Sequence, residues 1–399
     1  MLNKPFRIAM LPASTDGVNY YRMACWAFEM RKYRNVTVDL AWFRYETTPG
    51  ELHSWQEDVN SMVPSADVPG LTIGQYIRAS IDHFCEQADV VLWHPMYYPA
   101  SMDLFMEMKH KHQKPFIVEV DDNYVDVPTW NEAYHSFRNG SSFRSISLES
   151  MRQADALMVT TPHLGELYTQ FNENVYVIEN SLDFRGDRKF VGWDKVSVRK
   201  HKGIRLGWIG GRAHFEDLMM VSPVLREILK KHSDVTLVLV NSALKPSCKA
   251  LGKEYPFEGL SVQYADRSVA INRYAQFAAS FGFDIGLAPL VDCSFNRSKS
   301  NLRWLEYSAL SLPTVATDVG HFSATIPNGT QALLVKENDP DKWFNSIETL
   351  IKDENMRIEM GRQAYKRVKK DYNVERNSPK YLRLLKELAN TSIEQEAVA

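Results

Sequence analysis

The stretch LAPLVDCSFNRSKSNLRWLEYSALSLPTVATDVG, residues 287–320, decides the fold of this chain. It begins with an apolar strand that ends at Pro289, continues through a polar loop, and enters a helix that Leu312 and Pro313 terminate. A second β-branched strand (313–318) follows at once. A strand, a helix and another strand in this order are typical of a parallel sheet with helical crossovers. We therefore expect an α/β fold in this half of the chain.

The polar loop of this stretch and the helix after it carry candidate binding residues. The loop supplies Arg297, Lys299 and Ser300, and the helix supplies Glu306. Lys299 and Glu306 are seven residues apart, about two helical turns, so that both side chains can face one cleft. A lysine beside a helix N-terminus can neutralise phosphate, and a carboxylate further along the helix can accept hydrogen bonds from sugar hydroxyls. The alternative is a solvated helix with routine charges, which apolar neighbours such as Trp304 disfavour.

The same alternation of strand and helix runs through the whole chain. The apolar, β-branched segments of the first half are FRIAMLP (6–12), VTVDLAWF (36–43), ADVVLWH (88–94), PFIVEVDD (115–122), ADALMVTT (154–161) and VYVIEN (175–180). Those of the second half are IRLGWIG (204–210), VTLVLVN (235–241), SVQYAD (261–266), FDIGLAPL (283–290), PTVATD (313–318) and QALLVKE (331–337). Segments with helical spacing lie between them, for example 20–33, 73–87, 100–113 and 217–232. This order predicts two tandem Rossmann-like, doubly wound parallel-sheet domains.

A polar, basic stretch over residues 186–203 interrupts the pattern and is typical of an interdomain linker. We place the N-terminal domain at 1–190 and the C-terminal domain at 191–372. The last part of the chain has helical spacing and no further strand pattern, which predicts a helical tail at 373–399.

Composition limits the class of protein further. The 399 residues, 44% of them apolar, suffice for two cores, and the formal net charge of −2 provides no global field for nucleic acid or anionic lipid. Residues 1–190 carry 17 basic and 25 acidic side chains and residues 191–399 carry 30 and 24, so we expect an anionic ligand in the second half. Four separated cysteines form no CxxC pair, which argues against a zinc site or redox dithiol and favours a reduced, cytoplasmic compartment. No apolar run has the length of a membrane span.

A second candidate ligand loop is GWIGGRAHFEDL (207–218), where a strand gives way to a helix. Gly210 and Gly211 let the backbone approach a ligand closely, and the helix start offers unpaired N–H groups that suit a diphosphate. Arg212 and His214 add further donors. A tight turn whose glycines serve only its geometry remains the alternative.

The first half supplies candidates for the opposite side of a cleft. Gly17 follows the first strand and precedes a helix that carries Tyr21 and Arg22. We count Gly17 among the donor-binding residues and place Tyr21 and Arg22 on the acceptor side, although packing explains the tyrosine more readily and a flexible turn is the alternative for the glycine.

Two further strand ends are rich in aromatic and acidic residues. They supply His94, Tyr97, Asp121, Asp122 and Trp130. The aromatic rings can stack on a sugar, and a carboxylate can orient an acceptor hydroxyl or act as a base. A satisfied strand-end aspartate and a packed histidine are the plainer interpretations. We do not expect metal ligation by the aspartate pair, because the features that suit a nucleotide lie in the second half.

The stretch 287–320 resembles the donor site of GT-B glycosyltransferases, in particular of the retaining family 4 type, the glycosyl transferases group 1. In that family a donor helix carries a glutamate that is followed by a small-residue turn and a Leu-Pro strand, as in LEYSALSLPTVATDVG here. The resemblance covers nearly the whole chain, including the loop Asp16-Gly17-Val18, the segment IENSLD (178–183) and the helical tail. The family pattern has a second glutamate at the position of Ser298, so only Glu306, by resemblance the ribose contact, is carried over.

The resemblance implies a metal-independent enzyme that moves a sugar from a nucleotide-diphosphate sugar to an acceptor with retained configuration. It needs no cofactor beyond this co-substrate, and the departing phosphate helps to deprotonate the acceptor. Lys299, Glu306, Asp122 and His94 are the candidate catalytic residues, and the tail is expected to return to the N-terminal domain.

Several alternatives stay open at this stage. A glycan or lipid is the favoured acceptor, a modified DNA base in a viral system is another, and the basic segment 366–372 allows peripheral membrane contact. An impaired sugar- or nucleotide-binding module, for which Ser298 is the motive, and a nucleotide-sugar epimerase or a phosphorylase of the same fold are the competing functions.

Overall fold

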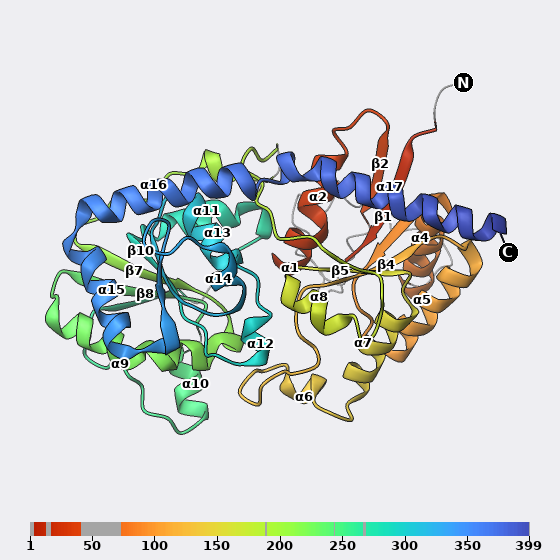
Figure 1. Ribbon diagram of the computed structural model, residues 1–399. Helices are drawn as coiled ribbons and strands as arrows, with labels where there is room; N and C mark the ends of the chain where they lie inside the picture. The colour runs from red at the N-terminus through yellow and green to blue at the C-terminus, as the bar shows by residue number, and fades with distance from the viewer. Residues whose placement is uncertain are drawn as a thin grey trace. The chain divides into compact units, whose positions relative to one another are not determined.

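The computed structural model describes residues 4–12, 17–40, 73–187, 190–242, 244–265 and 269–398 (Figure 1). The chain divides into two compact units. The first unit contains Met1–Tyr124, Asn139–Ser181 and Val374–Ala399, and the second contains Val125–Arg138 and Leu182–Asn373. Each unit is built on a parallel sheet with helical connections, so the predicted fold class is confirmed.

The sheet of the first unit has the strand order β2-β1-β3-β4-β5-β6. Its strands are β1 (Phe6–Leu11), β2 (Val36–Leu40), β3 (Val90–Trp93), β4 (Phe116–Val120), β5 (Ala156–Val159) and β6 (Val175–Val177). The main helices between them are α4 (Ile73–Gln87), α5 (Pro99–His112), α7 (Ser142–Gln153) and α8 (Pro162–Tyr168). The strand order reverses between β1 and β3, and such a reversal marks the place where open parallel sheets bind ligands.

The sheet of the second unit has the strand order β12-β11-β10-β7-β8-β9. Its strands are β7 (Ile204–Ile209), β8 (Val235–Val240), β9 (Val262–Ala265), β10 (Ile285–Ala288), β11 (Thr314–Thr317) and β12 (Leu333–Val335). Its helices include α9 (Phe215–Lys231), α10 (Leu244–Ala250), α11 (Tyr274–Ser280), α12 (Ser294–Arg297), α13 (Leu302–Ala309) and α14 (Gly320–Thr325). Here the order reverses between β7 and β10.

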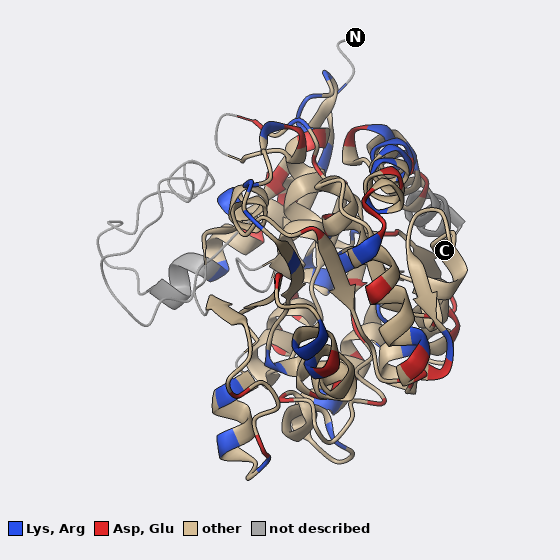
Figure 2. Ribbon diagram, turned by 90° about the vertical axis from the view of Figure 1, so that its left-hand side faces the viewer, with Lys and Arg blue, Asp and Glu red and all other residues tan. Residues whose placement is uncertain are grey.

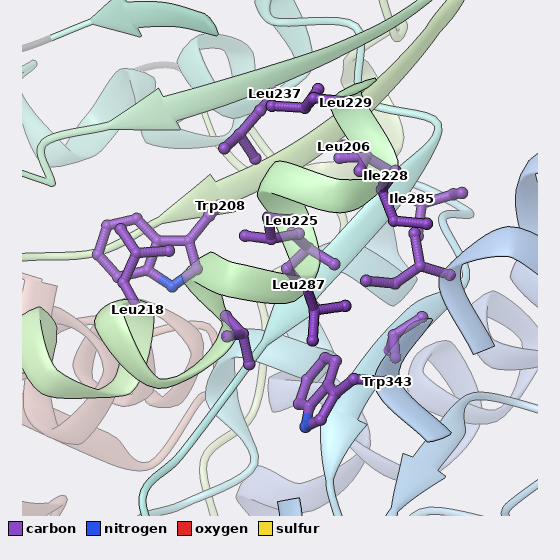
Figure 3. Close-up of a cluster of buried hydrophobic side chains, with 14 of the residues drawn as sticks. Leu206, Trp208, Leu218, Leu225, Ile228, Leu229, Leu237, Ile285, Leu287 and Trp343 are labelled. Atoms are coloured by element: carbon purple, nitrogen blue, oxygen red, sulfur yellow. The ribbon is translucent and has the colours of Figure 1, made fainter. Parts of the chain in front are cut away.

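The core of the second unit lies between this sheet and the helices α9 and α15 (Pro340–Lys352), as Figure 3 shows. Leu218 and Leu225 project from α9 at helical spacing and are buried together with Trp208 of β7, Leu237 of β8 and Trp343 of α15. Burial of such side chains stabilises the fold by about 25 cal/mol for each Å² of apolar surface removed from water. The core therefore fixes α9, and with it the loop that joins β7 to α9.

A close contact between β10 and α13 fixes the second element of the ligand-binding edge. The buried ring of Tyr307 lies directly against Gly286, where a Cβ atom would overlap the ring. The Tyr307 hydroxyl lies 3.3 Å from the carbonyl oxygens of Gly207 and Leu287 and accepts a hydrogen bond from the Ile209 N–H at 3.2 Å. These contacts attach α13 to β7 and β10 at once.

Three helices end the chain, and they are divided between the units. Helices α15 and α16 (Glu354–Asp371) belong to the second unit, whereas α17 (Val374–Val398) belongs to the first (Figure 1). Helix α17 contacts α2 (Cys25–Met30) and β3, and the ring of Tyr381 packs edge-on against Trp26 at 5.1 Å between centroids. The C-terminal segment thus supplies part of the core of the N-terminal unit.

The helix that we predicted over residues 20–33 differs from the observed structure. It starts as η1 (Tyr20–Ala24), a π-helical turn in which Arg22 is buried, and becomes an α-helix only in α2. π-Helical turns are rare, and those that occur are often found at functional sites.

Basic residues of α16 form ion pairs. Lys369 lies 2.8 Å from Asp194, Arg367 lies 2.5 Å from Asp371, and Arg362 pairs with Glu359. Figure 2 shows acidic positions close to basic ones on many helices. Arg367 and Lys369 of the segment 366–372 are thus engaged in ion pairs, as is common on a solvated helix face.

Candidate functional site

The carboxyl ends of β7 and β10 bring the two predicted ligand loops of the second unit together. The strands are neighbours in the sheet, and residues 210–214 follow β7 while residues 289–300 follow β10. Backbone N–H groups and loop side chains converge at such a reversal point. The predicted donor-binding residues of the second half therefore lie at one edge of one sheet.

The loop after β7 runs close to side chains of this edge. A Cβ atom at Gly210 would lie 2.6 Å from the Trp208 ring and 2.8 Å from the Arg303 guanidinium, so this position requires glycine. Gly211 has open space around it, and Arg212 is exposed at the start of η4 (Arg212–His214). The two glycines therefore differ in role. Gly210 allows close packing of the loop against Trp208 and Arg303, and Gly211 leaves the backbone open.

Asp217 joins the two loops, and the sequence did not identify it as a site residue. One of its carboxylate oxygens accepts hydrogen bonds from the Val291 N–H at 2.7 Å and from Asn296 Nδ2 at 2.8 Å, and the other lies 2.8 Å from His214 Nδ1. The side chain is almost fully buried. Asp217 therefore holds the loop after β7 against the loop after β10.

His214 lies in a cationic neighbourhood. Burial lowers the pKa of His214, the Arg303 and Lys299 charges lower it further, and its contact with Asp217 opposes both effects. The guanidinium of Arg303 lies 5.1 Å from the Trp208 ring centre and donates to the Ile209 carbonyl oxygen. Arg303 is thus a further cation at this edge, although the sequence prediction did not place it among the donor-binding residues.

The three polar residues that we predicted in the loop before α13 have different surroundings. Lys299 is half-buried with its ammonium 4.4 Å from the centre of the Phe295 ring, and Ser300 is also half-buried. Arg297 instead is exposed and forms a bidentate ion pair with Asp292 at 2.7 and 3.1 Å. Lys299 therefore belongs to the same electrostatic neighbourhood as His214, whereas Arg297 lies in a surface ion pair.

Glu306 is half-buried on α13 and accepts a hydrogen bond from the Tyr274 hydroxyl at 3.2 Å. Burial raises the pKa of Tyr274 well above its usual value, and the Glu306 charge raises it further, so the tyrosine stays a hydrogen-bond donor at neutral pH. Ser298 is fully buried and donates to the Ser294 carbonyl oxygen at 3.0 Å. A glutamate at position 298 would have to place its charge in this packed turn.

A second polar cluster lies at the reversal point of the first unit. His94 directly follows β3, and its Nδ1 lies 3.2 Å from the Tyr97 hydroxyl. The Tyr97 hydroxyl lies 3.0 Å from the Tyr124 hydroxyl, which donates to the Asp121 carboxylate at 3.4 Å. The Asp122 carbonyl oxygen accepts from the Tyr168 hydroxyl at 2.6 Å. The structure thus joins the catalytic candidate His94 and the acceptor-side candidates Tyr97 and Asp121 in one hydrogen-bonded chain that runs through the Tyr124 hydroxyl.

The acceptor-side candidates Tyr21, Arg22 and Trp130 and the donor-binding candidate Gly17 have different surroundings. Tyr21 and Arg22 are buried in η1, and Arg22 forms an ion pair with Glu119 at 2.6 Å. Gly17 is half-buried at the start of α1 (Gly17–Asn19), whereas its neighbour Asp16 lies outside the described residues. Trp130 is exposed and belongs to the second unit.

Two properties of the described residues bear on the chemistry. Among them, no group of three or more His, Cys, Asp or Glu side chains could hold a metal ion. None of their helices is long and apolar enough to cross a membrane.

Comparison with known proteins gives matches along the sequence. Residues 302–367, which include Arg303 and Glu306, match the model of the family described as Glycosyl transferases group 1. The D-inositol 3-phosphate glycosyltransferase of Corynebacterium jeikeium (strain K411) is 25% identical over 244 residues, which are 57% of this chain and 56% of the relative. The enzyme of the same description from Paenarthrobacter aurescens (strain TC1) is 40% identical over 60 residues, 15% of each chain. The match to the first relative thus spans little more than half of its length.

Solved structures resemble the chain over nearly its whole length. HepE from Anabaena, in complex with UDP and glucose, has a TM-score of 0.64 at 12% identity and covers 96% of this chain and 99% of its own. Sucrose-phosphate synthase from Thermosynechococcus elongatus has a TM-score of 0.66 at 14% identity and covers 97% of this chain and 100% of its own.

The two parallel sheets and these likenesses define a chain of the GT-B fold class. Within that class, the segment 302–367 is similar to the Glycosyl transferases group 1 family, whose model it matches.

Proposed function

We propose that this protein is a glycosyltransferase that binds a nucleotide-diphosphate sugar at the β7 and β10 edge and transfers the sugar to an acceptor hydroxyl. The observation that carries the proposal is the gathering of Lys299 and Arg303 around the Gly210 loop, with Glu306 one helical turn beyond Arg303 on α13, within or next to the segment that matches the glycosyltransferase family. Group 1 relatives bear the description of glycosyltransferases, and HepE was solved with UDP and glucose. A UDP-sugar is therefore the first donor to test.

The charges at this edge support a metal-independent reaction. Lys299 and Arg303 lie close enough to lower the pKa of His214 through their charges, so the same cations are available to a diphosphate. Preorganised positive charge that faces a developing anion is usually the largest contribution to catalysis. Glu306, oriented by the Tyr274 hydroxyl, accepts hydrogen bonds from ribose hydroxyls in this scheme.

We propose that the reaction proceeds with retention of configuration. The bond between the anomeric carbon and the diphosphate oxygen breaks, and a bond from the same face of that carbon to the acceptor oxygen forms. The acceptor proton passes to the departing phosphate oxygen, which is the base. The cations stabilise this leaving group, and its oxygen still accepts the proton. The hydrogen-bonded chain of His94, Tyr97 and Asp121 supplies acceptor-side contacts in this scheme.

The acceptor that we propose is a hydroxyl of a glycan or lipid. The printed description of the relatives adds inositol phosphate to the compounds that should be assayed. Aromatic and hydroxyl side chains at the end of β3, such as Tyr97, suit a polyol better than a phosphate backbone.

The experiment measures thermal stability with nucleotides and nucleotide sugars in the presence of a chelator. A donor at about 100 times its Kd stabilises the folded protein by about 2.7 kcal/mol, so the melting temperature should rise with one nucleotide family. Glu306→Gln and Lys299→Ala should abolish this rise. The matched control is the exposed ion pair of Lys245 and Glu258 in the same unit, where Lys245→Ala and Glu258→Gln should leave it intact.

Product analysis then separates the competing functions. Transfer to an added polyol with unchanged anomeric configuration, seen by NMR, supports the proposal. Release of free nucleotide diphosphate with an isomerised sugar would identify an epimerase, and binding without turnover would identify a binding module. A folded wild-type protein that binds none of these nucleotides contradicts the proposal.

A further inference from the structure

The contacts of Asp217 determine which nitrogen of His214 carries a proton. Asp217 receives two hydrogen bonds from groups that can only donate in this geometry, the Val291 N–H and Asn296 Nδ2. The orientation of the Asn296 amide is fixed, because the same Nδ2 also donates to the Val291 carbonyl oxygen at 2.9 Å. Both hydrogen bonds end on the same carboxylate oxygen, so the other oxygen is the one that faces His214. An ionised carboxylate only accepts hydrogen bonds, so His214 Nδ1, at 2.8 Å from its second oxygen, must carry the hydrogen.

Burial and the surrounding charges determine the overall state of His214. Burial lowers the pKa of the ring most, Arg303 from α13 and Lys299 from the loop before it lower it further, and Asp217 from α9 is the opposing charge. A neutral imidazole with its hydrogen on Nδ1 has a lone pair on Nε2. Nε2 is then a hydrogen-bond acceptor.

The position of the ring makes this acceptor available to a ligand. His214 ends η4, directly after the Gly210 and Gly211 loop, and about a fifth of its side chain is exposed. The ring packs edge-on against Trp208, and the Arg303 guanidinium lies 5.1 Å from the centre of the same Trp208 ring. An acceptor placed beside two cations does not suit a phosphate oxygen, which at neutral pH also accepts hydrogen bonds. It suits a hydroxyl or N–H group of the sugar or nucleoside to which the phosphate is linked.

From this arrangement we propose that Asp217 is a positioning residue that makes His214 Nε2 an acceptor for a hydroxyl or N–H group of the nucleotide sugar. The inference rests on the proposed function, because it requires that such a donor binds at this edge. It differs from the sequence-based expectation that His214 donates to the diphosphate. The histidine selects for the uncharged part of the donor, and the cations hold the charged part.

The decisive variant is Asp217→Asn. Asparagine keeps an oxygen for Val291 and Asn296 and puts an NH₂ group opposite His214 Nδ1, so Nδ1 must become an acceptor and the proton must move to Nε2. We expect ¹⁵N NMR of ligand-free wild-type protein to show a protonated Nδ1 in His214, and the variant to show a protonated Nε2. The His214→Gln spectrum assigns the signal.

Binding measurements test the role of this tautomer. Asp217→Asn should weaken donor binding about tenfold or more, because a donor then faces a donor, with little change in melting temperature. In the Asp217→Asn background, His214→Gln should restore much of the affinity, because a glutamine amide can turn its oxygen to the ligand. The matched control is Asp284→Asn, which changes the separate pair of Asp284 and His201 at the amino end of β10 and should not alter donor binding.

The ligand series identifies the group that His214 recognises. Equal losses for UDP and for UDP-sugar assign the contact to the nucleoside, and a loss for UDP-sugar alone assigns it to a sugar hydroxyl. A protonated Nε2 in wild type, or unchanged donor affinity in Asp217→Asn, overturns the inference while leaving the proposed function standing. Failure of the wild-type protein to bind any nucleotide sugar overturns both.

Discussion

At the scale of single residues, the contrast between Arg22 and Arg303 shows what decides the role of a charge. Arg22 lies in the helical turn that follows β1, and Arg303 lies on α13, but their surroundings differ. Arg22 is 2% exposed and donates to Glu119, to the Ile178 carbonyl oxygen and to Asn180, all within the first unit. Its donors are used for internal contacts, so we assign it a structural role, in place of the acceptor contact that the sequence led us to expect.

This assignment predicts a large loss of stability when one partner of the pair is removed. Burial raises the pKa of Glu119 to about 7 even though the Arg22 charge lowers it, so desolvation of this pair is expensive. Glu119→Gln keeps the shape of the side chain and leaves Arg22 as a buried charge without a counter-ion, which costs about 3–5 kcal/mol. Urea unfolding should show this as a lower midpoint.

Two further variants control that experiment. Replacing both partners, as in Arg22→Met with Glu119→Leu, should recover most of the stability, because no buried charge remains. Glu149→Gln in the exposed pair with Arg152 should cost less than about 1 kcal/mol. A loss below about 1 kcal/mol for Glu119→Gln would show that the pair contributes no more than an exposed one.

At the scale of elements, helix α16 depends on one glycine for its contact with the end of α13. A Cβ atom at Gly361 would overlap the Ser311 carbonyl oxygen, in the turn that leads to β11. A glycine in a helix normally costs about 1 kcal/mol relative to alanine. Here the sign should reverse, and Gly361→Ala should lower the free energy of unfolding by at least about 1 kcal/mol, because the helix must move away from the turn.

Gly165 in α8 provides the matched control for this prediction. A Cβ atom there would lie 3.4 Å from a Val177 methyl group, which is ordinary contact. Gly165→Ala should therefore be neutral or stabilising in the same urea unfolding experiment. Equal gains in both variants would mean that helix propensity outweighs packing at Gly361.

The elements also show how far the sequence predicts the structure. All of the predicted strand segments contain an observed strand, because most of these strands are buried and rich in apolar, β-branched residues, whereas β6 and β9 at the sheet edges are only partly buried. The π-helical turn of η1 was missed, because its helical spacing of apolar residues is that of an ordinary α-helix and the burial of Arg22 depends on Glu119, far away in the sequence.

The candidate site was predicted less completely than the fold. Strand-end loops and the glycine pair identified the edge where Lys299 and Glu306 lie. Asp217 was missed because its partners are 74 and 79 residues away, and no local pattern reports such a contact. Arg297 differs from Asp217, because its ion-pair partner Asp292 is only five residues away, and the path of the loop sets this pairing.

At the scale of the whole molecule, the chain crosses between its units more than once, and the last segment completes the first unit. Tyr381 and Ser378 of α17 contact Trp26 and Tyr33, the latter through a 2.8 Å hydrogen bond between hydroxyl groups. The N-terminal unit therefore cannot reach its full stability until α17 has been made. Substitutions in α17 should act on the first unit, although Leu182–Asn373, which precede this helix, belong to the second.

Tyr381→Ala tests this dependence, because it removes a fully buried ring and leaves a cavity beside Trp26. Loss of such a ring costs about 3–5 kcal/mol. Hydrogen exchange measured by mass spectrometry should show faster exchange in α2 and β3, which contact α17, and unchanged exchange in β8 of the second unit. Arg383→Ala, an exposed change on the same helix, should leave both regions protected. Equal loss of protection in β8 would mean that the two units unfold as one, and then the tail would stabilise the whole chain instead of the first unit alone.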